Sequence, residues 1–493
     1  MARYQAAVKP WFQAQLATMT DLPRYEISAT LQPDADRLQG ELRLHLTNTS
    51  PDPWRTLVFR LYPALIQYGG GADDTMVVQR ALVNGQVINP TYLAHNTAIE
   101  LLLPEILRAG DTVEVELHWL VKFPEWQKEE ENYVLFGKRQ QMISLPLFYP
   151  SLAVYEPLRG ARPGQWWTTE GIVRGDAAFN PISLFDVTLT MPADQAPVTS
   201  GTLITSTFIN EQQARHVWVT GPSREFLLHT SPQFRSAYTE AYGTRVTSYW
   251  LPGQEATGHA ALTYAVAALR IYSDRFGPYP FRDLRVAPAP LSYRGMEYPQ
   301  ASLIGVDLYA NDLEDLEILV AHEVAHQWWY QIVHNDPVKE PWLDEALAEY
   351  SVHLYFEDLY SQKRAAVYQD RRWQLPLDSL KSQKYDTAID QPVNDFLNGA
   401  QYETVIYGKG ALFYASLRQA LGDYRFKRFL RTYFQTHQYQ IVTTDDWLAA
   451  IHTLNNPALD VLYEEWVKPP ALLPPAAVSP TLTPLPLPTN GQK

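Results

Sequence analysis

The sequence has 493 residues, of which 46% are hydrophobic and 19% are charged, and its formal net charge is −14. A chain of this length is expected to form two or three globular domains, and its negative charge argues against nucleic acid as a partner. It contains 0 cysteines, which excludes disulfides and thiolate metal sites. No apolar run reaches the roughly 18 residues of a membrane-spanning helix, so no integral membrane segment is expected. The first residues also lack the apolar core of a signal peptide.

The first half of the sequence is predicted to be β-structure. Residues Glu41–Asn48 and Thr112–Val121 alternate apolar with polar side chains, which is the period of a half-buried strand. Similar segments, separated by Gly, Pro, Asn and Asp, follow as far as Thr247–Leu251. The pattern predicts an all-β domain over residues 1–241.

Beyond that domain the apolar residues recur at helical spacing. The segment Glu255–Arg275 has this spacing, and Gly277 with Pro278 ends the run. The remainder predicts a mainly α domain over residues 242–467, followed by a flexible Pro-rich tail over residues 468–493. Further helices are expected at Asp312–Val333, Pro341–Gln362, Gly408–Leu421 and Tyr424–His437.

One predicted helix carries the sequence HEVAH, which is typical of zinc metallohydrolases. His322 and His326 are four residues apart, so on a helix both imidazoles leave one face and can share a cation, with Glu323 beside it. Taken singly, each histidine could equally be a core imidazole. The short pattern alone also arises by chance in some chains of this length.

The next predicted helix offers a third ligand. Glu345 lies on a segment that can fold back antiparallel to the first helix, and two imidazoles with one carboxylate leave the fourth zinc position for water. Glu349 is four residues further on and shares the helix face of Glu345. It could accept a hydrogen bond from a ligand imidazole, or it could be a solvated helix carboxylate.

With these motifs the sequence resembles the M1 family of zinc aminopeptidases in the gluzincin clan. The resemblance rests on HEVAHQWW and WLDEALAEY, on Arg294-Gly295-Met296-Glu297-Tyr298 in place of the family's usual Gly-Ala-Met-Glu-Asn, and on Tyr407-Gly408-Lys409-Gly410-Ala411. It implies an N-terminal all-β, saddle-like domain followed by a thermolysin-like, mainly α catalytic domain. Because the sequence reaches its Pro-rich stretch soon after Trp466, it resembles a short form without the family's large helical C-terminal domain.

The resemblance implies one Zn²⁺ per chain and two catalytic residues. Glu323 would act as general base towards the attacking water and return the proton to the leaving amine. Tyr407 would donate a hydrogen bond to the carbonyl oxygen as that oxygen becomes negative.

The resemblance also implies a set of substrate-binding residues. Glu297 would hold the free α-ammonium group of the substrate, while Gly295 and Met296 would form a backbone edge that pairs with an extended peptide. The family often supplies a glutamine to the amine site from its N-terminal domain, and Gln141 is the nearest candidate, although it could be an ordinary strand-surface residue. Arg294 adds a positive charge here, and we expect its side chain to point away from the amine site.

The function predicted from the sequence is a zinc-dependent aminopeptidase that acts on peptides with a free N-terminus. The alternatives are a zinc endopeptidase, an epoxide hydrolase like leukotriene A4 hydrolase, and a non-catalytic interaction protein on the same scaffold. No pattern indicates an oligomeric state. A secreted or cell-envelope location suits the Pro-rich tail and the missing cysteines, and a cytoplasmic location stays open.

Overall fold

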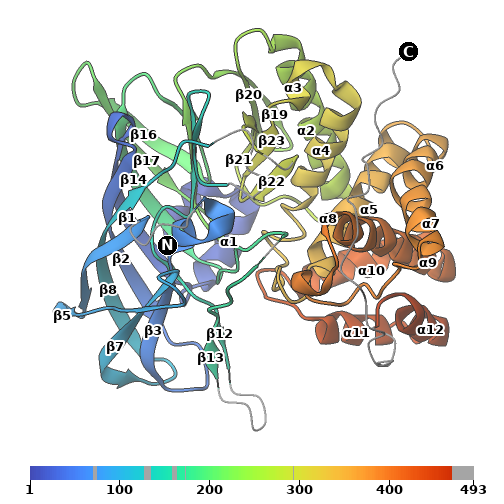
Figure 1. The fold of residues 1–493 in the computed structure, drawn as a ribbon, viewed down its shortest axis with the longest axis horizontal. Coiled ribbons are helices and arrows are strands. Elements are labelled where there is room, and N and C mark those ends of the chain that lie inside the picture. The colour runs from blue at the N-terminus through green and yellow to red at the C-terminus, as the bar shows by residue number, and fades with distance from the viewer. Residues whose placement is uncertain (70–74, 127–134, 158–163, 173, 292–293, 469–493) are drawn as a thin grey trace.

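The computed structural model describes residues 1–69, 75–126, 135–157, 164–172, 174–291 and 294–468. Strands make up most of the N-terminal half, and helices make up most of the C-terminal half (Figure 1). This arrangement confirms the predicted fold class. The predicted tail, apart from Lys468, lies outside the described residues. Among the described helices, none is long and apolar enough to cross a membrane.

The largest sheet of the N-terminal half has eight strands. The alternation that predicted strands near residues 41–48 and 112–121 corresponds to two neighbouring central strands, which bury every second side chain. β1 and β14 pair in parallel, and the other neighbours in this sheet are antiparallel. In spatial order the strands are β16 (Thr202–Phe208), β17 (Gln213–Val219), β14 (Leu184–Pro192), β1 (Arg24–Gln32), β2 (Arg37–Thr47), β8 (Thr112–Lys122), β4 (Met76–Val83) and β5 (Gln86–Ile88).

Three smaller sheets complete this half of the molecule. A large hydrophobic core that includes the buried rings of Trp119 and Tyr149 runs through it. Two of the sheets have four strands each, β15 (Ala196–Thr199), β18 (Leu227–Ser231), β10 (Met142–Pro146), β9 (Gly137–Arg139), and β11 (Ser151–Leu152), β3 (Trp54–Arg60), β7 (Ala98–Leu107), β6 (Thr91–Leu93). The third pairs β12 (Tyr155–Glu156) with β13 (Gln165–Trp166).

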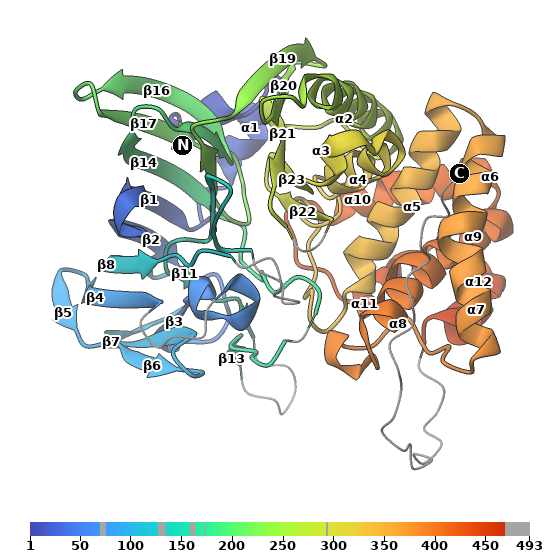
Figure 2. The same ribbon diagram turned by 45° about the horizontal axis from the view of Figure 1, so that its top comes forward.

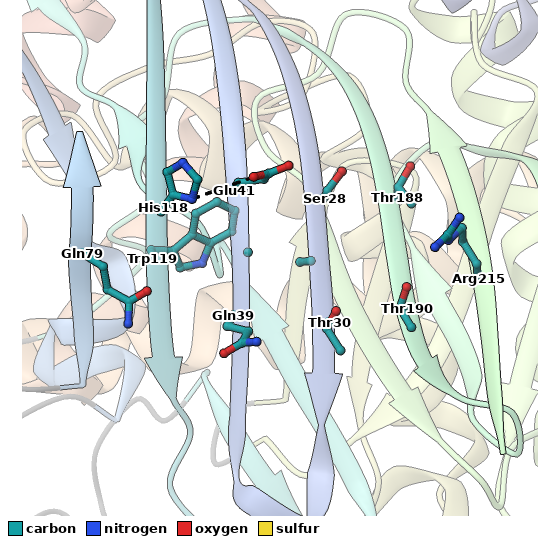
Figure 3. Close-up of a pocket in the computed structure, with 12 residues that line it drawn as sticks. Ser28, Thr30, Gln39, Glu41, Gln79, His118, Trp119, Thr188, Thr190 and Arg215 are labelled. Atoms are coloured by element: carbon teal, nitrogen blue, oxygen red, sulfur yellow. Dashed lines mark ion pairs between the residues drawn. The ribbon is translucent and has the colours of Figure 1, made fainter. Parts of the chain in front are cut away.

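A polar groove of about 610 Å³ lies over the eight-stranded sheet (Figure 3). Within it His118 and Glu41 form an ion pair with 3.8 Å between Nδ1 and Oε2. None of the site residues predicted from the sequence lines this groove. Hydroxyl and amide side chains dominate its lining, namely Ser28, Thr30, Gln39, Gln79, Thr188 and Thr190.

A five-stranded mixed sheet lies between the N-terminal strands and the helices (Figure 2). The predicted domain boundary at residues 241 and 242 falls in the turn between its first two strands, so this sheet starts earlier in the sequence, at Arg235. β22 is an edge strand of the sheet and pairs antiparallel with β23. The spatial order is β19 (Arg235–Ala241), β20 (Thr244–Trp250), β21 (Asp283–Ala289), β23 (Ala301–Gly305) and β22 (Gly295–Tyr298).

The helices pack beside this sheet, and most lie close to the predicted ranges. The helix expected at Asp312–Val333 is shorter, because α4 ends at Ala325 and the residues after it turn back into the core. The short helices at the N-terminus are η1 (Tyr4–Ala7) and α1 (Pro10–Thr18). The later helices are α2 (Glu255–Arg275), α3 (Leu308–Asn311), α4 (Leu313–Ala325), α5 (Trp342–Leu359), α6 (Gln362–Gln369), α7 (Leu375–Ser382), α8 (Gly399–Tyr402), α9 (Gly410–Leu421), α10 (Asp423–Thr436), α11 (Thr444–His452) and α12 (Pro457–Trp466), with π-helical turns η5 (Asp370–Gln374) and η7 (Glu403–Lys409).

The first residues of the chain cross over to the second domain. The backbone N–H of Lys9 donates to the carbonyl of Pro280 at 2.8 Å, and the N–H of Arg282 donates to the carbonyl of Ala7 at 3.0 Å. The side chain of Arg282 adds a hydrogen bond from Nε to the carbonyl of Val8 at 2.8 Å. These contacts join the N-terminal segment to the second domain, although the paired residues lie far apart in the sequence.

Candidate metal centre and active site

The three predicted metal ligands meet where α4 and α5 pack together. Nε2 of His322 and Nε2 of His326 lie 3.1 Å apart, and each lies 3.3 Å from Oε2 of Glu345. His326 directly follows the last residue of α4 and keeps helical backbone angles, so both imidazoles leave the same face as the spacing predicted. All three side chains are buried.

This triangle of ligand atoms fits a tetrahedral zinc ion. Zinc binds imidazole nitrogen and carboxylate oxygen at about 2.0–2.2 Å, and tetrahedral geometry at that distance places the ligand atoms ~3.3–3.6 Å from one another. The measured separations of 3.1–3.3 Å are close to these values. His322, His326 and Glu345 therefore form a site suited to one zinc ion, and three protein ligands leave a fourth position for water or substrate.

Hydrogen bonds fix the orientation of both imidazoles. Nδ1 of His322 lies 3.2 Å from Oε2 of Glu349, and Nδ1 of His326 lies 2.8 Å from the carbonyl oxygen of Trp329. Each Nδ1–H donates to its acceptor, which leaves the Nε2 lone pair for a metal. Glu349 also accepts hydrogen bonds from the hydroxyl of Tyr368 and from Nε1 of Trp373, and it is 7% exposed, so it is not a solvated helix carboxylate.

The carboxylate of Glu345 is held in its ionised form. Burial alone would raise its pKa, but when the adjacent imidazoles of His322 and His326 are protonated they lower the pKa well below its ordinary value, and a cation in their place would act in the same direction. An ionised carboxylate is the form that binds a metal. The second oxygen of Glu345 accepts a hydrogen bond of 2.8 Å from the hydroxyl of Tyr407.

Glu323 lies beside the ligands with one oxygen left over. The residue is 3% exposed, and its Oε2 is buried without a hydrogen-bond partner in the part of the chain that the structure describes. Burial, together with the neighbouring charge of Glu297, raises the pKa of Glu323 to about 8. A bound cation would lower the pKa of Glu323 again, towards ~7, and a general base works best when its pKa is near the operating pH.

β22 brings its backbone directly against Glu323. A Cβ atom built on Gly295 would lie 2.0 Å from Oε1 of Glu323, so a larger residue here would require the Glu323 side chain to shift. Met296 is buried, and Glu297 is 6% exposed. Burial raises the pKa of Glu297, whereas the imidazole charge of His326 lowers it, which places the Glu297 carboxylate within electrostatic range of the metal site.

Arg294 is paired with a partner other than Glu297. Its Nη2 donates to Oδ2 of Asp315 in the first turn of α4, and its side chain is 48% exposed. The positive charge is thereby directed towards solvent and α4. This is the orientation expected if the amine site is to keep its full negative charge.

Tyr407 lies on the π-helical turn η7, next to the metal ligands. Its ring centroid is 5.8 Å from that of His322, and its hydroxyl contacts Glu345 as described above. π-Helical turns occur often at functional sites because they shift the side chains of a helix by one position. The phenol is close enough to the ligands to reach a substrate atom bound at the metal.

Gln141 lies elsewhere, in an exposed turn. With Gln140 it connects β9 to β10, and its φ of 63° is in the left-handed region. It is not among the buried residues that surround the metal site, so the structure gives no support to its predicted contact with the substrate amine.

Three residues that the sequence did not single out lie close to Glu297 instead. Asp176 and Glu225 come from the N-terminal half and are both buried, and their electrostatic neighbours include Glu297. Tyr330 has a φ of 147°, uncommon for a bulky residue, and its hydroxyl donates to Oε1 of Glu225 at 2.7 Å. The only signal of Asp176 and Glu225 in the sequence is an acidic residue within a small or apolar stretch, which occurs at many positions, and Tyr330 is one of 30 tyrosines.

Comparisons with known proteins agree with this geometry. The model of the Peptidase family M1 domain matches residues 260–466. Aminopeptidase M1-B and Aminopeptidase M1-C from Oryza sativa subsp. japonica are 27% and 28% identical to the chain over 243 residues, which is 46% of this chain and 27% of each relative. The chain thus matches only about a quarter of the length of these curated relatives.

The solved structures extend the likeness to both domains. The M1 zinc metallopeptidase from Deinococcus radiodurans matches with a TM-score of 0.67 and 20% identity, over 92% of this chain and 95% of that chain. A mutant of the same enzyme, bound to a Tyr-Ser-Ala substrate, matches with a TM-score of 0.67 and 19% identity over the same shares. At this identity the match shows a shared two-domain fold.

Proposed function

Because residues 260–466 match the model of the Peptidase family M1 domain, we propose that the protein is a zinc-dependent aminopeptidase, which removes the first residue from peptides with a free N-terminus. The observation that carries the proposal is the position of Glu297. It is a buried carboxylate on an edge strand, within electrostatic range of the metal ligands, and the preceding Gly295 touches the general base.

A carboxylate in this place selects the end of a peptide chain. An α-ammonium group bound by Glu297 would set the first peptide bond beside Glu323 and the metal site, because β22 offers its unpaired edge to an extended substrate. An acetylated terminus has no positive charge and adds bulk where the chain should end. Exopeptidase specificity follows from that anchor.

The remaining residues supply the chemistry of hydrolysis. Zinc bound to His322, His326 and Glu345 would supply Lewis acidity towards the scissile carbonyl and the attacking water. Glu323 takes the proton from the water and delivers it to the leaving amine. The Tyr407 hydroxyl turns from Glu345 to the carbonyl oxygen as negative charge develops there.

The names of the relatives support this proposal. The rice proteins are called aminopeptidases, and the Deinococcus enzyme is called a zinc metallopeptidase, with a tripeptide as the substrate of its mutant. An endopeptidase would need the metal site and Glu323 but no buried anchor for an ammonium group.

The test compares one peptide with a free and with an acetylated N-terminus. We expect the wild type to cleave only the free peptide efficiently, releasing its first residue. In Glu297→Gln the kcat/KM of the free peptide should fall by about tenfold or more, because an amide replaces a charged partner. Glu317→Gln is a matched control, because Glu317 is also buried but bonds to Tyr355 and Tyr360. Equal cleavage of both peptides by the wild type, or mainly internal cuts, would contradict the proposal.

Metal content provides an independent test of the site. The wild type should contain one zinc per chain, and a double variant with His322→Ala and Glu345→Ala should contain none. Stoichiometric zinc in the double variant would show that other residues bind the metal.

A further inference from the structure

Asp176 is a buried carboxylate with one oxygen left unpartnered. It lies in the segment before β14 and is 7% exposed. Its Oδ1 accepts hydrogen bonds from the backbone N–H groups of Ala177 at 2.6 Å and Ala178 at 3.0 Å. Its Oδ2 is buried and has no hydrogen-bond partner among the described residues. Two backbone donors therefore fix the carboxylate and leave Oδ2 available to a ligand.

Asp176 is close to the active site. A Cβ atom built on the preceding Gly175 would lie 2.9 Å from the hydroxyl of Tyr402, and the ring of Tyr402 lies 5.9 Å from that of Tyr407. Burial raises the pKa of Asp176, and the charge of Glu297 contributes to the same rise, so Glu297 is an electrostatic neighbour of Asp176. The segment that carries Asp176 thus packs beside Tyr402, which adjoins Tyr407, and Asp176 itself is an electrostatic neighbour of the proposed amine anchor.

The neighbouring Glu225 has no such oxygen to spare. Its Oε1 accepts from the hydroxyl of Tyr330 at 2.7 Å, and its Oε2 accepts from Nδ2 of Asn180 at 3.2 Å. Glu225 is therefore satisfied within the protein, and Asp176 is the carboxylate of this pair that can receive a ligand.

Two tyrosine hydroxyls that are electrostatic neighbours of Asp176 also lack hydrogen-bond partners among the described residues. The hydroxyls of Tyr68 and Tyr298 are buried without a partner in the described part of the chain, and Asp176 is an electrostatic neighbour of both. Buried polar atoms without partners are costly and rare in folded proteins. Three such atoms on residues that are electrostatic neighbours, one of them a carboxylate oxygen, suit a cation with several N–H donors. A guanidinium group has five such donors in a planar arrangement, and aromatic rings favour cations at their faces.

We propose that Asp176, with the hydroxyls of Tyr68 and Tyr298, binds the positively charged side chain of the substrate's first residue, so that the enzyme prefers N-terminal arginine or lysine. This inference rests on the proposed aminopeptidase function. Glu297 binds the single charge of the α-ammonium group, and Asp176 binds the second charge, which only a basic first residue carries.

The test uses two substrates that differ only in side-chain charge. Citrulline has the shape of arginine but a neutral ureido group, so the ratio of kcat/KM for arginyl and citrullinyl anilides reports the charge alone. We expect the wild type to prefer the arginyl substrate by about tenfold or more, which is the size of a hydrogen bond to a charged group. In Asp176→Asn this ratio should fall towards one, mainly through loss of arginyl hydrolysis.

A matched variant and a binding measurement separate this role from a structural one. Glu225→Gln alters a buried acid whose oxygens are already occupied, and it should keep the preference for arginine. Free L-arginine should raise the melting temperature of the wild type more than L-citrulline does, and Asp176→Asn should lose this difference.

The outcomes that would overturn the proposal are distinct. A wild-type kcat/KM ratio near one would show that the enzyme has no preference for the arginyl substrate. An unchanged ratio in Asp176→Asn would show that Asp176 does not cause the preference. An equal loss for both substrates in Asp176→Asn would mean that Asp176 binds the α-ammonium group or only supports the fold. Failure of the aminopeptidase function itself would be seen separately, as equal cleavage of free and acetylated peptides that begin with alanine.

Discussion

At the scale of single residues, Glu323 is positioned by contacts from two directions. Its helix places it beside His322, and Gly295 lies so close that a Cβ atom there would overlap Oε1 of Glu323. Oε2 has no hydrogen-bond partner among the described residues. The unpartnered Oε2 is available to accept a proton from a water molecule at the metal site. Its chemistry can therefore be tested without disturbing the metal.

We expect Glu323→Gln to keep its zinc and to lose turnover by about a hundredfold or more, because an amide cannot accept the proton of the attacking water. Zinc content and kcat for an aminoacyl anilide are the measurements. Glu317→Gln, on the same helix, should retain both. Near-normal kcat in Glu323→Gln would assign the role of base to another group.

Tyr407→Phe should lower kcat by about tenfold to a thousandfold and change KM little, because the phenol hydrogen bond to the substrate forms mainly in the transition state. Tyr414→Phe is the control, since that hydroxyl is buried and accepts a hydrogen bond from Nε1 of Trp447. If KM rose in Tyr407→Phe while kcat stayed constant, Tyr407 would instead be a ground-state binding residue.

The sequence predicts the site unevenly at this scale. His322, His326 and Glu345 follow from helical spacing, because the distances between residues on one or two helices are fixed by geometry. Glu297 and Tyr407 lie on a strand and a π-helical turn, where no spacing rule connects them to the metal, and only the family resemblance identifies them.

At the scale of elements, β22 combines three roles in four residues. It closes one edge of the five-stranded sheet, presents Glu297, and brings a glycine against the general base. The third role depends on the missing side chain at position 295.

We therefore expect Gly295→Ala to displace the Glu323 side chain with zinc content unchanged, and to lower kcat by less than about tenfold, because the family usually carries alanine at this position. Gly399→Ala serves as the control, because a Cβ atom there meets nothing within 4 Å. Crystallographic comparison of Gly295→Ala with the wild type would show the displaced carboxylate. A larger loss of kcat would mean that the displaced carboxylate no longer reaches the attacking water.

The bounds of a helix were predicted correctly where one face of the helix is buried and the opposite face is exposed. α2 has the predicted bounds Glu255–Arg275, because its apolar residues occupy one stripe. α4 ends at Ala325 although helix was expected as far as Val333, since the residues after His326 are buried on every side. Continuous burial removes the periodicity that distinguishes a helix from a turn.

At the scale of the whole molecule, residues from both halves form one buried polar cluster. Glu225 and Asn180 belong to the N-terminal half, and Tyr330 belongs to the catalytic half. No property of the sequence predicts such a cluster, because it depends on how the two domains dock.

The cluster predicts a dependence of stability on pH. Burial raises the pKa of Glu225 from 4.5 to about 8, so between these values the folded protein holds a proton that the unfolded chain has lost. Stability contributed by this group therefore falls as pH rises, by at most about 1.4 kcal/mol per pH unit. We expect the melting temperature of the wild type to fall relative to that of Glu225→Gln between pH 5 and pH 8.

The matched control is Glu211→Gln, which makes the same change in net charge at an exposed turn. Its difference from the wild type should stay nearly constant over this pH range. A constant difference for Glu225→Gln as well would mean that Glu225 is ionised in the folded protein at pH 5.

The crossing of the first residues onto the second domain has a consequence for synthesis. The hydrogen bond from Arg282 to Val8 joins positions separated by 274 residues, so the partners of residues 7–9 leave the ribosome long after those residues. At about 5–20 residues per second this delay is of the order of tens of seconds. The eight-stranded sheet, whose strands all lie before residue 220, can pair during that time, and the N-terminal segment closes over the second domain only afterwards.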